Sequence, residues 1–140
     1  MRNAVLMLGL LAGCAAPAPL ASPTAHPFDG RWAVTQTCPA MALGVRGYVY
    51  QFPAYIRDSV FRGEQGREGE PGWLLLRGPV QRDGRATLEA QGLTGTVETT
   101  AGFLASSTPY RYTVEARFQP RSGQGRRIEV RTCTLDFARA

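Results

Sequence analysis

Few residues of this 140-residue chain belong to the types that carry out catalysis or bind metal ions. His26 is the only histidine and there is no lysine. Of the acids, several fall on the polar faces of expected strands: Glu89, Glu98, Glu115 and Glu129. No nucleophile has a recognisable base beside it, and a metal centre needs more Cys or His ligands. We therefore expect no catalytic residue, no metal site and no cofactor.

All sixteen basic residues are arginines, and the formal net charge is +5. A guanidinium binds phosphate through a fork of N–H donors, so phosphate or nucleic-acid binding is one interpretation. The arginines are scattered, however, and only Arg126 and Arg127 are adjacent. No basic patch is interleaved with aromatic residues. We favour biased codon composition as the explanation and expect no nucleic-acid partner.

The first thirteen residues have the organisation of an export signal. Arg2 precedes an apolar run, residues 4–11, that is too short to span a bilayer. The stretch Leu11-Ala12-Gly13-Cys14 resembles the lipobox of bacterial lipoproteins. The resemblance implies that residues 1–13 are removed and that Cys14 becomes the lipidated N-terminus, with palmitate among its acyl chains. An ordinary signal peptide, cut within residues 15–18, is the alternative.

The same resemblance divides the chain and places it in the cell. Residues 14–27 would comprise the lipidated Cys14 and a Pro-rich tether that contains His26, and residues 28–140 form one domain. In Gram-negative lipoproteins an Asp after the lipidated Cys marks retention in the inner membrane. Ala15 at that position implies a protein anchored in the outer membrane and facing the periplasm, with the inner membrane as the alternative.

Cys38 and Cys133 are the pair that remains once Cys14 carries the lipid. In an oxidising compartment an even pair favours a disulfide. A metal pair lacks further ligands, and a redox pair lacks the Cys-x-x-Cys spacing. On the chain-entropy model a bridge closing so long a loop contributes about 4–5 kcal/mol.

The segments around these two cysteines would position them as antiparallel strands. With Cys38 facing Cys133, Trp32 lies opposite Arg139. Side chains alternate along a strand, so one face also carries four further residues: Val34, Gln36, Leu135 and Phe137. A chain whose first and last strands pair in this way closes into a barrel.

Alternating apolar and polar residues predict further short strands, at 47–52, 73–80, 86–98 and 110–118. Pro53 is expected to end one strand, and the polar run 63–72 to form a loop. A Gly- and Arg-rich turn is expected at 120–125. The last strand is expected at 128–137, with a β-bulge near Arg131. The fold class predicted is all-β, a small antiparallel up-and-down barrel of about seven or eight strands, its first and last strands paired and disulfide-linked.

The run Phe28-Asp29-Gly30-Arg31-Trp32 resembles the Gly-x-Trp signature that opens the first strand of lipocalin and avidin-like barrels. In those families the Trp closes the barrel floor and an arginine of the last strand packs over its ring. The resemblance therefore assigns barrel closure to Trp32 and Arg139, with Arg131 as the second choice. A guanidinium stacked on indole contributes about 0.5–2 kcal/mol. The other lipocalin segments are not recognisable, so the resemblance concerns architecture.

Two non-catalytic functions fit such a barrel. The first is a membrane-anchored envelope interaction or inhibitor module that binds a partner protein, as in small bacterial lipoprotein barrels that inhibit hydrolases. The alternative is a lipocalin-like carrier of a small apolar ligand, in a cavity lined by Gln36, Trp73, Phe103, Tyr110 and Tyr112. For Gln36, a satisfied interior amide is the other interpretation. Eight strands leave an interior only just wide enough for side chains, which favours the interaction module.

Overall fold

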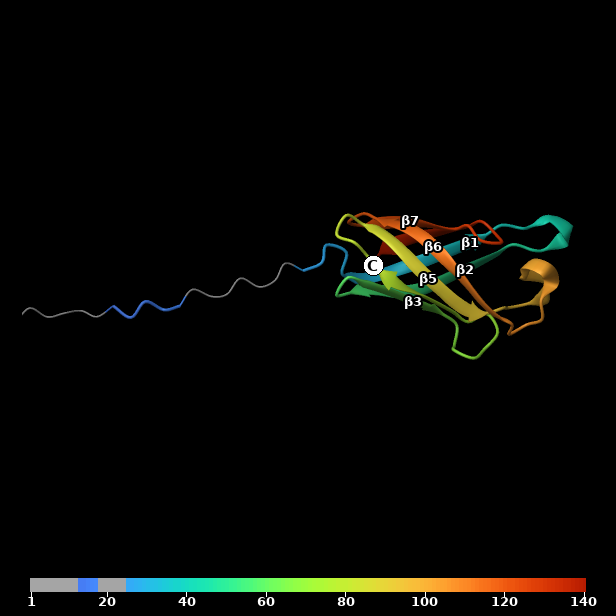
Figure 1. Ribbon diagram of the computed structural model, residues 1–140, viewed down its shortest axis with the longest axis horizontal. Coiled ribbons are helices and arrows are strands. Elements are labelled where there is room, and N and C mark those ends of the chain that lie inside the picture. Colours follow the sequence, from blue (N-terminus) through green and yellow to red (C-terminus); the bar gives the residue numbers. More distant parts are fainter. Residues whose placement is uncertain (1–12, 18–24) are drawn as a thin grey trace, which may run out of the picture.

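Eight antiparallel strands close into one barrel in the computed structural model, which describes residues 13–17 and 25–140 (Figure 1). The strands are β1 (Gly30–Cys38), β2 (Tyr48–Arg57), β3 (Val60–Gln65), β4 (Leu74–Pro79), β5 (Arg85–Leu93), β6 (Pro109–Phe118), β7 (Ser122–Arg127) and β8 (Cys133–Arg139). Each strand pairs with its neighbours in sequence, and β1 pairs with β8. The predicted fold class is confirmed. The expected signal peptide, Gly13 apart, and residues 18–24 of the expected tether lie outside the described residues.

The pairing of β1 with β8 has the register that the cysteines predict. Trp32 lies opposite Arg139 and Gln36 lies opposite Leu135. Cys38 and Cys133 form a disulfide at the end of this ladder, which confirms the predicted link between the first and last strands. Closure gives every strand of the described barrel two neighbours, although the ladders differ in length and residues 48–53 of β2 pair with β1 alone.

The barrel core consists of the inward-facing residues of all eight strands. Four large aromatic side chains lie at its centre, each with its ring centroid 4.8–5.8 Å from another: Trp32, Phe61, Phe118 and Phe137. On β7 the inward positions are glycines. A Cβ on Gly125 would lie 3.0 Å from a Val114 methyl and 3.2 Å from the Phe137 ring. The missing side chains therefore make room for the aromatic centre.

These glycines explain where the predicted strand boundaries are wrong near the C-terminus. Residues 122–125, expected to form a turn, belong to β7, because inward glycines remove the apolar alternation that marks a strand. The segment 128–137, expected to be one strand with a bulge, is a loop followed by β8. Val130 lies in that loop with a φ of 63°. The apolar residues change from even numbers, Ile128 and Val130, to odd numbers from Cys133 onwards because the first two are exposed in the loop. No β-bulge is involved.

Pro53 does not end a strand, because β2 continues through it to Arg57. Proline has no N–H to donate, and the ladder between β2 and β3 stops at the adjacent Ala54. A two-residue turn, Asp58 and Ser59, then joins β2 to β3 with φ values of 50° and 65°. The Asp29 carboxylate accepts the N–H groups of both turn residues at 3.1 and 3.2 Å. A side chain thus stabilises a turn that lacks the usual glycine.

The two ends of the barrel differ in their connections. Figure 1 shows residues 25–29 entering the barrel at the end opposite to the short helices η1 (Ala42–Gly44) and η3 (Ala101–Phe103). We call the end with the longer connections the mouth; its loops are 39–47, 66–73, 94–108 and 128–132, the third of which also holds η2 (Val97–Thr99). The opposite end, with short turns at 58–59, 80–84 and 119–121, is the closed end.

Candidate functional site

The closed end is sealed by the two residues that the Gly-x-Trp resemblance assigned to it. The guanidinium carbon of Arg139 lies 5.6 Å from the centre of the Trp32 ring. The same guanidinium donates hydrogen bonds to three backbone carbonyls, those of Pro27, Asp29 and Pro120. Arg139 thereby joins the entering chain, the last strand and the β6–β7 turn. Arg131, the second choice for this contact, lies at the mouth.

The interior between Trp32 and the mouth is filled by side chains with satisfied polar groups. The Tyr112 hydroxyl donates to Gln36 Oε1 at 3.1 Å, and Gln36 Nε2 donates to the Cys38 sulfur at 3.4 Å. Gln36 is fully buried, so it is a satisfied interior amide. Trp73 is buried as well but lies outside the core cluster, and its Nε1 donates at 2.9 Å to the outward-facing Glu64. Glu64 belongs to β3, although its segment was expected to form a loop.

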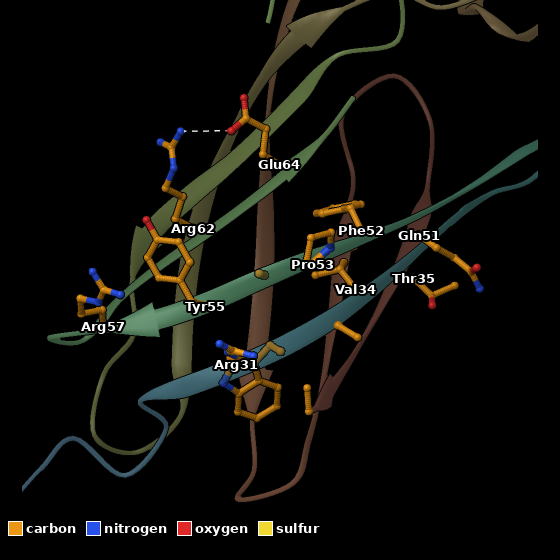
Figure 2. A pocket seen from close by; sticks show the side chains of 14 residues that line it. Arg31, Val34, Thr35, Gln51, Phe52, Pro53, Tyr55, Arg57, Arg62 and Glu64 are labelled. Carbon is orange, nitrogen blue, oxygen red and sulfur yellow. Dashed lines mark hydrogen bonds and ion pairs between the residues drawn. The ribbon is translucent and has the colours of Figure 1, made fainter. Parts of the chain in front are cut away.

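A hollow of about 930 Å³ lies on the outer wall of the barrel, over β1, β2 and β3 (Figure 2). Its floor includes Ala33 and Pro53, which face each other in the β1–β2 ladder. Longer side chains border these two: Arg31, Tyr55, Arg57 and Arg62. The hollow is therefore a shallow surface outside the barrel interior, with Ala33 and Pro53 in its floor and three arginines and one acid, Glu64, at its border.

A smaller pocket, of about 160 Å³, lies in the mouth. Three tyrosines line it: Tyr48, Tyr50 and Tyr110. Its lining also contains three arginines, at positions 111, 127 and 131, and no Asp or Glu. The Tyr110 ring lies parallel to that of Tyr112, with 5.7 Å between the centroids. Of the residues predicted to line a ligand cavity, Tyr110 alone belongs to this pocket.

Phe103 does not line the mouth pocket, which corrects its expected position. It lies in η3 with 45% of its surface exposed, while the neighbouring Leu104 lines the pocket. The alternation of residues 93–97 predicts that the strand beginning at residue 86 extends to residue 98, close to Phe103 in the sequence. Instead β5 ends at Leu93, and short 3₁₀ turns follow. Parity along a strand gives no information about side-chain direction in such turns.

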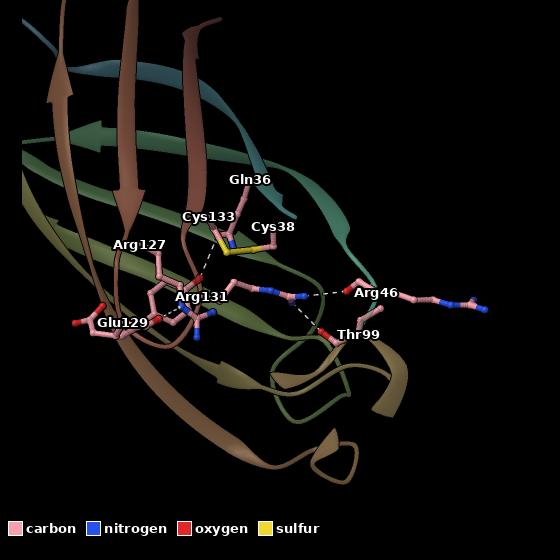
Figure 3. The surroundings of a disulfide bond; sticks show 9 residues. Gln36, Cys38, Arg46, Thr99, Arg127, Glu129, Arg131 and Cys133 are labelled. Carbon is pink, nitrogen blue, oxygen red and sulfur yellow. Dashed lines mark hydrogen bonds between the residues drawn. A yellow bond between two sulfur atoms is a disulfide. The ribbon is translucent and has the colours of Figure 1, made fainter. Parts of the chain in front are cut away.

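Arg131 holds the loops of the mouth together (Figure 3). It is 5% exposed, and its two terminal nitrogens donate to the carbonyls of Thr99 and Arg46, each at 2.9 Å. Its guanidinium carbon lies 5.3 Å from the centre of the Tyr48 ring. Its Nε has no hydrogen-bond partner, and within residues 25–140 no carboxylate lies at ion-pair distance. The mouth pocket therefore contains a buried positive charge without a counter-ion, which is unfavourable in the free protein.

The titratable side chains that line the mouth pocket are phenols and guanidinium groups. Burial raises the pKa of Tyr110 and of Tyr112 well above the ordinary value, because a buried phenolate would lose its hydration. Burial, and then the neighbouring Tyr48, raises the pKa of Tyr50 in the same direction. Arg127 lies over the Tyr112 ring at 3.9 Å. Phenol and guanidinium donors therefore surround the pocket at neutral pH, an arrangement that suits an acceptor-rich or anionic group.

Apolar side chains surround the mouth at its surface. Eight large hydrophobic residues are exposed within the described part of the chain, and all but Tyr55 lie at the mouth. We call these seven the apolar rim: Leu43, Val49, Val97, Phe103, Leu104, Ile128 and Val130. Exposed apolar side chains gathered at one end of a protein are typical of binding surfaces.

Three residues of the apolar rim also have strained backbones. Leu43, Phe103 and Val130 have φ values of 65°, 51° and 63°. The left-handed conformation costs a residue with a Cβ about 1–2 kcal/mol, and a β-branched residue is least suited to it. Strain of this kind concentrates at binding sites. The apolar rim is therefore the strongest candidate for a functional surface at the mouth.

The described residues give no positive indication of metal chemistry. Residues 13–17 and 25–140 contain no group of three or more His, Cys, Asp or Glu that could hold an ion. His26 packs on the Phe28 ring at the closed end, with 5.7 Å between the ring centroids.

Within residues 13–17 and 25–140 no helix is long and apolar enough to cross a membrane. No family model, no curated protein and no solved structure matches the chain.

Sequence reasoning missed most of the mouth. Tyr48 and Tyr50 had a usable signal, because they alternate on one face of a predicted strand. Arg127 had no such signal, because the two inward glycines before it in β7 hide the strand to which it belongs. The exposure of Val130 and its positive φ likewise depend on the length of a loop that the pattern did not reveal.

Proposed function

We propose that this chain is a non-catalytic lipoprotein of the bacterial envelope, anchored through Cys14, whose apolar rim binds a partner protein. The observation that carries the proposal is the apolar rim itself, seven exposed hydrophobic side chains around one end of a filled barrel. The chain enters the barrel at the other end (Figure 1). An anchored barrel can therefore present its mouth away from the membrane.

Binding of a protein would offset the cost of the strained rim. Burying an exposed Leu, Val or Phe side chain contributes about 1.5–3 kcal/mol, which exceeds the cost of one left-handed residue. Leu43 is 91% exposed and Val130 is 72% exposed, so both project from the loops. Projecting apolar side chains on loops tied together by Arg131 suit insertion into a partner's cleft, as an inhibitor module requires.

Site-specific photo-crosslinking in the native envelope tests this proposal. Crosslinkers at Leu43 and at Val130 should give the same protein adduct, because both residues belong to the apolar rim. Crosslinkers at Thr87 and Gln124, which are exposed on the barrel wall, are the controls. An adduct that forms equally from the wall, or no protein adduct from any rim position, would contradict the proposal.

Affinity measurements with the crosslinked partner then test the chemistry. Leu43→Ser and Val130→Ser should each weaken binding by at least tenfold, because an apolar contact worth over 1.4 kcal/mol is lost. Thr87→Ser is the matched control on the wall and should leave the affinity unchanged. If the partner is a hydrolase, its activity should fall on binding, which would identify the module as an inhibitor.

A carrier of a small apolar ligand is the second candidate, supported by the tyrosines of the mouth pocket. That pocket has a volume of about 160 Å³, whereas ligand sites usually measure about 300–1,000 Å³. Native mass spectrometry of the protein purified from the envelope distinguishes the two functions. A small molecule retained in equal amount with the protein, and lost in a Tyr50→Phe or Tyr110→Leu variant, would favour the carrier.

The anchor is tested separately through Cys14, which is exposed and unpaired in the described structure. Cys14→Ser should abolish acyl labelling and release the protein from the membrane fraction or leave it unprocessed. If acylation and fractionation are unchanged, the lipoprotein assignment is wrong. The apolar rim could still bind its partner in that case, so the two parts of the proposal fail independently.

A further inference from the structure

Strand pairing gathers arginines that are far apart in the sequence. Arg31 on β1 lies opposite Tyr55 on β2, Tyr55 lies opposite Arg62 on β3, and Arg62 lies opposite Arg77 on β4. We call these four residues the basic row. Each of the four adjoins a buried residue whose side chain faces the core, Trp32, Ala54, Phe61 and Leu76 in turn, so all four lie on the outer wall. The scatter of arginines along the sequence therefore hides a cluster on the surface.

The basic row contains more positive charge than its surroundings neutralise. Arg62 pairs with Glu64 at 3.3 Å. Glu89 lies opposite Arg77 in the β4–β5 ladder, but its carboxylate pairs with Arg111 at 3.0 Å. Within residues 25–140 no carboxylate lies at ion-pair distance from Arg31 or Arg77. Arg62 and Arg77 face each other directly, and like charges at such positions destabilise a sheet. Arg57, whose guanidinium carbon lies 5.2 Å from the Tyr55 ring, adds a further charge. A bound anion would relieve this repulsion.

The shape of the outer wall beside the basic row suits a phosphate group attached to a less polar body. Figure 2 shows Arg31, Arg57 and Arg62 around Tyr55, next to Pro53. These residues border the hollow of about 930 Å³ whose floor includes Ala33 and Pro53. Guanidinium forks can hold phosphate oxygens, while the floor accommodates the glycerol portion of a lipid.

Charge is distributed unequally between the two ends of the barrel. The turns and flanking strand positions of the closed end hold seven arginines: Arg31, Arg57, Arg82, Arg85, Arg117, Arg121 and Arg139. Only three acids accompany them: Asp29, Asp58 and Asp83. The loops and flanking strand positions of the mouth hold five arginines and five acids. The excess of positive charge therefore lies where the chain enters the barrel.

We propose that the basic row and the closed end bind the surface of a membrane that contains anionic phospholipids. Charge complementarity and the entry of the N-terminal segment at this end identify the occupant. A Pro-rich stretch as long as residues 15–27 can extend roughly 35–40 Å, so the tether alone does not orient the barrel. Attraction between arginines and anionic headgroups acts within a Debye length of the membrane surface and would hold this end against it. The mouth would then face away from the membrane, whichever partner it binds.

Vesicle co-sedimentation of residues 15–140 tests the proposal without the lipid anchor. This segment retains every strand, ladder and disulfide of the described structure. Vesicles of 30% phosphatidylglycerol in phosphatidylethanolamine are compared with vesicles of phosphatidylcholine alone. We expect binding to the anionic vesicles at low salt, its loss in 0.5 M NaCl and no binding to the neutral vesicles. Each arginine near an anionic surface contributes about fivefold in affinity, so the triple variant R31Q/R62Q/R77Q should bind about 100-fold more weakly.

A second triple variant, R46Q/R67Q/R126Q, is the control because it removes the same charge from exposed arginines elsewhere. It should lose less than tenfold. Equal losses in the two triple variants would overturn the proposal, as would equal binding to neutral vesicles or tighter binding to a DNA duplex. Saturable binding of inorganic phosphate without vesicle binding would assign a free anion instead. The R31Q/R62Q/R77Q variant should unfold at the same or a higher temperature, since repulsion is relieved; a lower temperature would indicate a structural role for the basic row.

Discussion

Trp32 and Arg139 show how a contact between single residues closes the barrel. Trp32 is 1% exposed, and the Arg139 guanidinium covers its ring while donating to three carbonyls, two in the entering chain and one in the β6–β7 turn. Trp32→Ala should lower the free energy of unfolding by about 3–5 kcal/mol, because it leaves a large cavity. Arg139→Ala should lower it by about 1–2 kcal/mol through lost stacking and packing.

A double-mutant cycle measured by urea unfolding separates this contact from the other effects of each substitution. We expect a coupling energy of about 0.5–2 kcal/mol between the two positions. Arg121→Ala, which changes another exposed arginine of the closed end, is the control and should not couple to Trp32. A coupling of zero for Arg139 would mean that the stacking contributes nothing to stability.

The buried phenols of the mouth predict a dependence of stability on alkaline pH. Burial raises the pKa of Tyr110 and Tyr112 in the folded state, so folding favours the protonated phenol. This contribution is complete below the unfolded value of about 10 and is lost as the pH rises from there through the folded pKa. The urea midpoint should therefore fall above about pH 10. A Tyr110→Phe/Tyr112→Phe variant should show a smaller fall, and an equal fall would assign the effect to other groups.

At the residue scale, the sequence predicts contacts that a strand register determines. The two cysteines set one register, and the period of two then placed Trp32 opposite Arg139. It does not predict contacts that depend on loop conformation. Arg131 reaches the carbonyls of Arg46 and Thr99 from another loop, and no periodicity relates these positions.

The mouth loops are the elements in which stability and binding should conflict. Val130 combines a φ of 63° with 72% exposure, so its side chain gives little packing in return for backbone strain. Val130→Gly should raise the free energy of unfolding by about 0.5–1 kcal/mol, measured by thermal or urea unfolding. The same substitution should weaken binding of the partner, because it removes a member of the apolar rim.

Thr132→Gly, on an exposed loop residue outside the set with positive φ, is the matched control and should not stabilise the protein. A loss of stability in Val130→Gly would show that the side chain packs in the mouth. In that case the apolar rim would have one member fewer, and its proposed role would rest on the other loops.

At the scale of elements, strands with apolar alternation were recognised and strands with other inward residues were not. The strand β6 has the clearest alternation and has nearly the predicted bounds. The sequence predicts a turn where β7 begins, because Gly123 and Gly125 occupy the inward positions beside Phe118 and Phe137 and leave no apolar alternation. Packing against distant aromatic rings selects those glycines, and such a requirement is not visible in the local sequence.

At the scale of the whole molecule, closure of the sheet separates two surfaces with different chemistry. The mouth carries the apolar rim and has balanced charge, whereas the closed end carries an excess of arginine and receives the N-terminal segment. The filled interior makes the barrel a rigid spacer between these surfaces. A membrane at one end and a protein at the other can therefore be engaged at the same time.

The disulfide should supply a large share of the stability of this closed barrel. Cys38 and Cys133 are 95 residues apart in sequence and join strands that are also paired by backbone hydrogen bonds. Replacing both by Ala should lower the free energy of unfolding by about 4–5 kcal/mol on the chain-entropy model, because the unfolded chain gains freedom. Small domains have total stabilities of about 5–15 kcal/mol, so the variant should fold only marginally. Urea unfolding of the oxidised protein and the variant measures the difference. The free energy of unfolding should fall more steeply with urea concentration in the variant, because its unfolded state is more expanded.

Alkylation of the unfolded but unreduced protein should label neither cysteine. Labelling of both, or an unchanged urea midpoint in the variant, would show that backbone pairing of β1 with β8 closes the barrel without the covalent link.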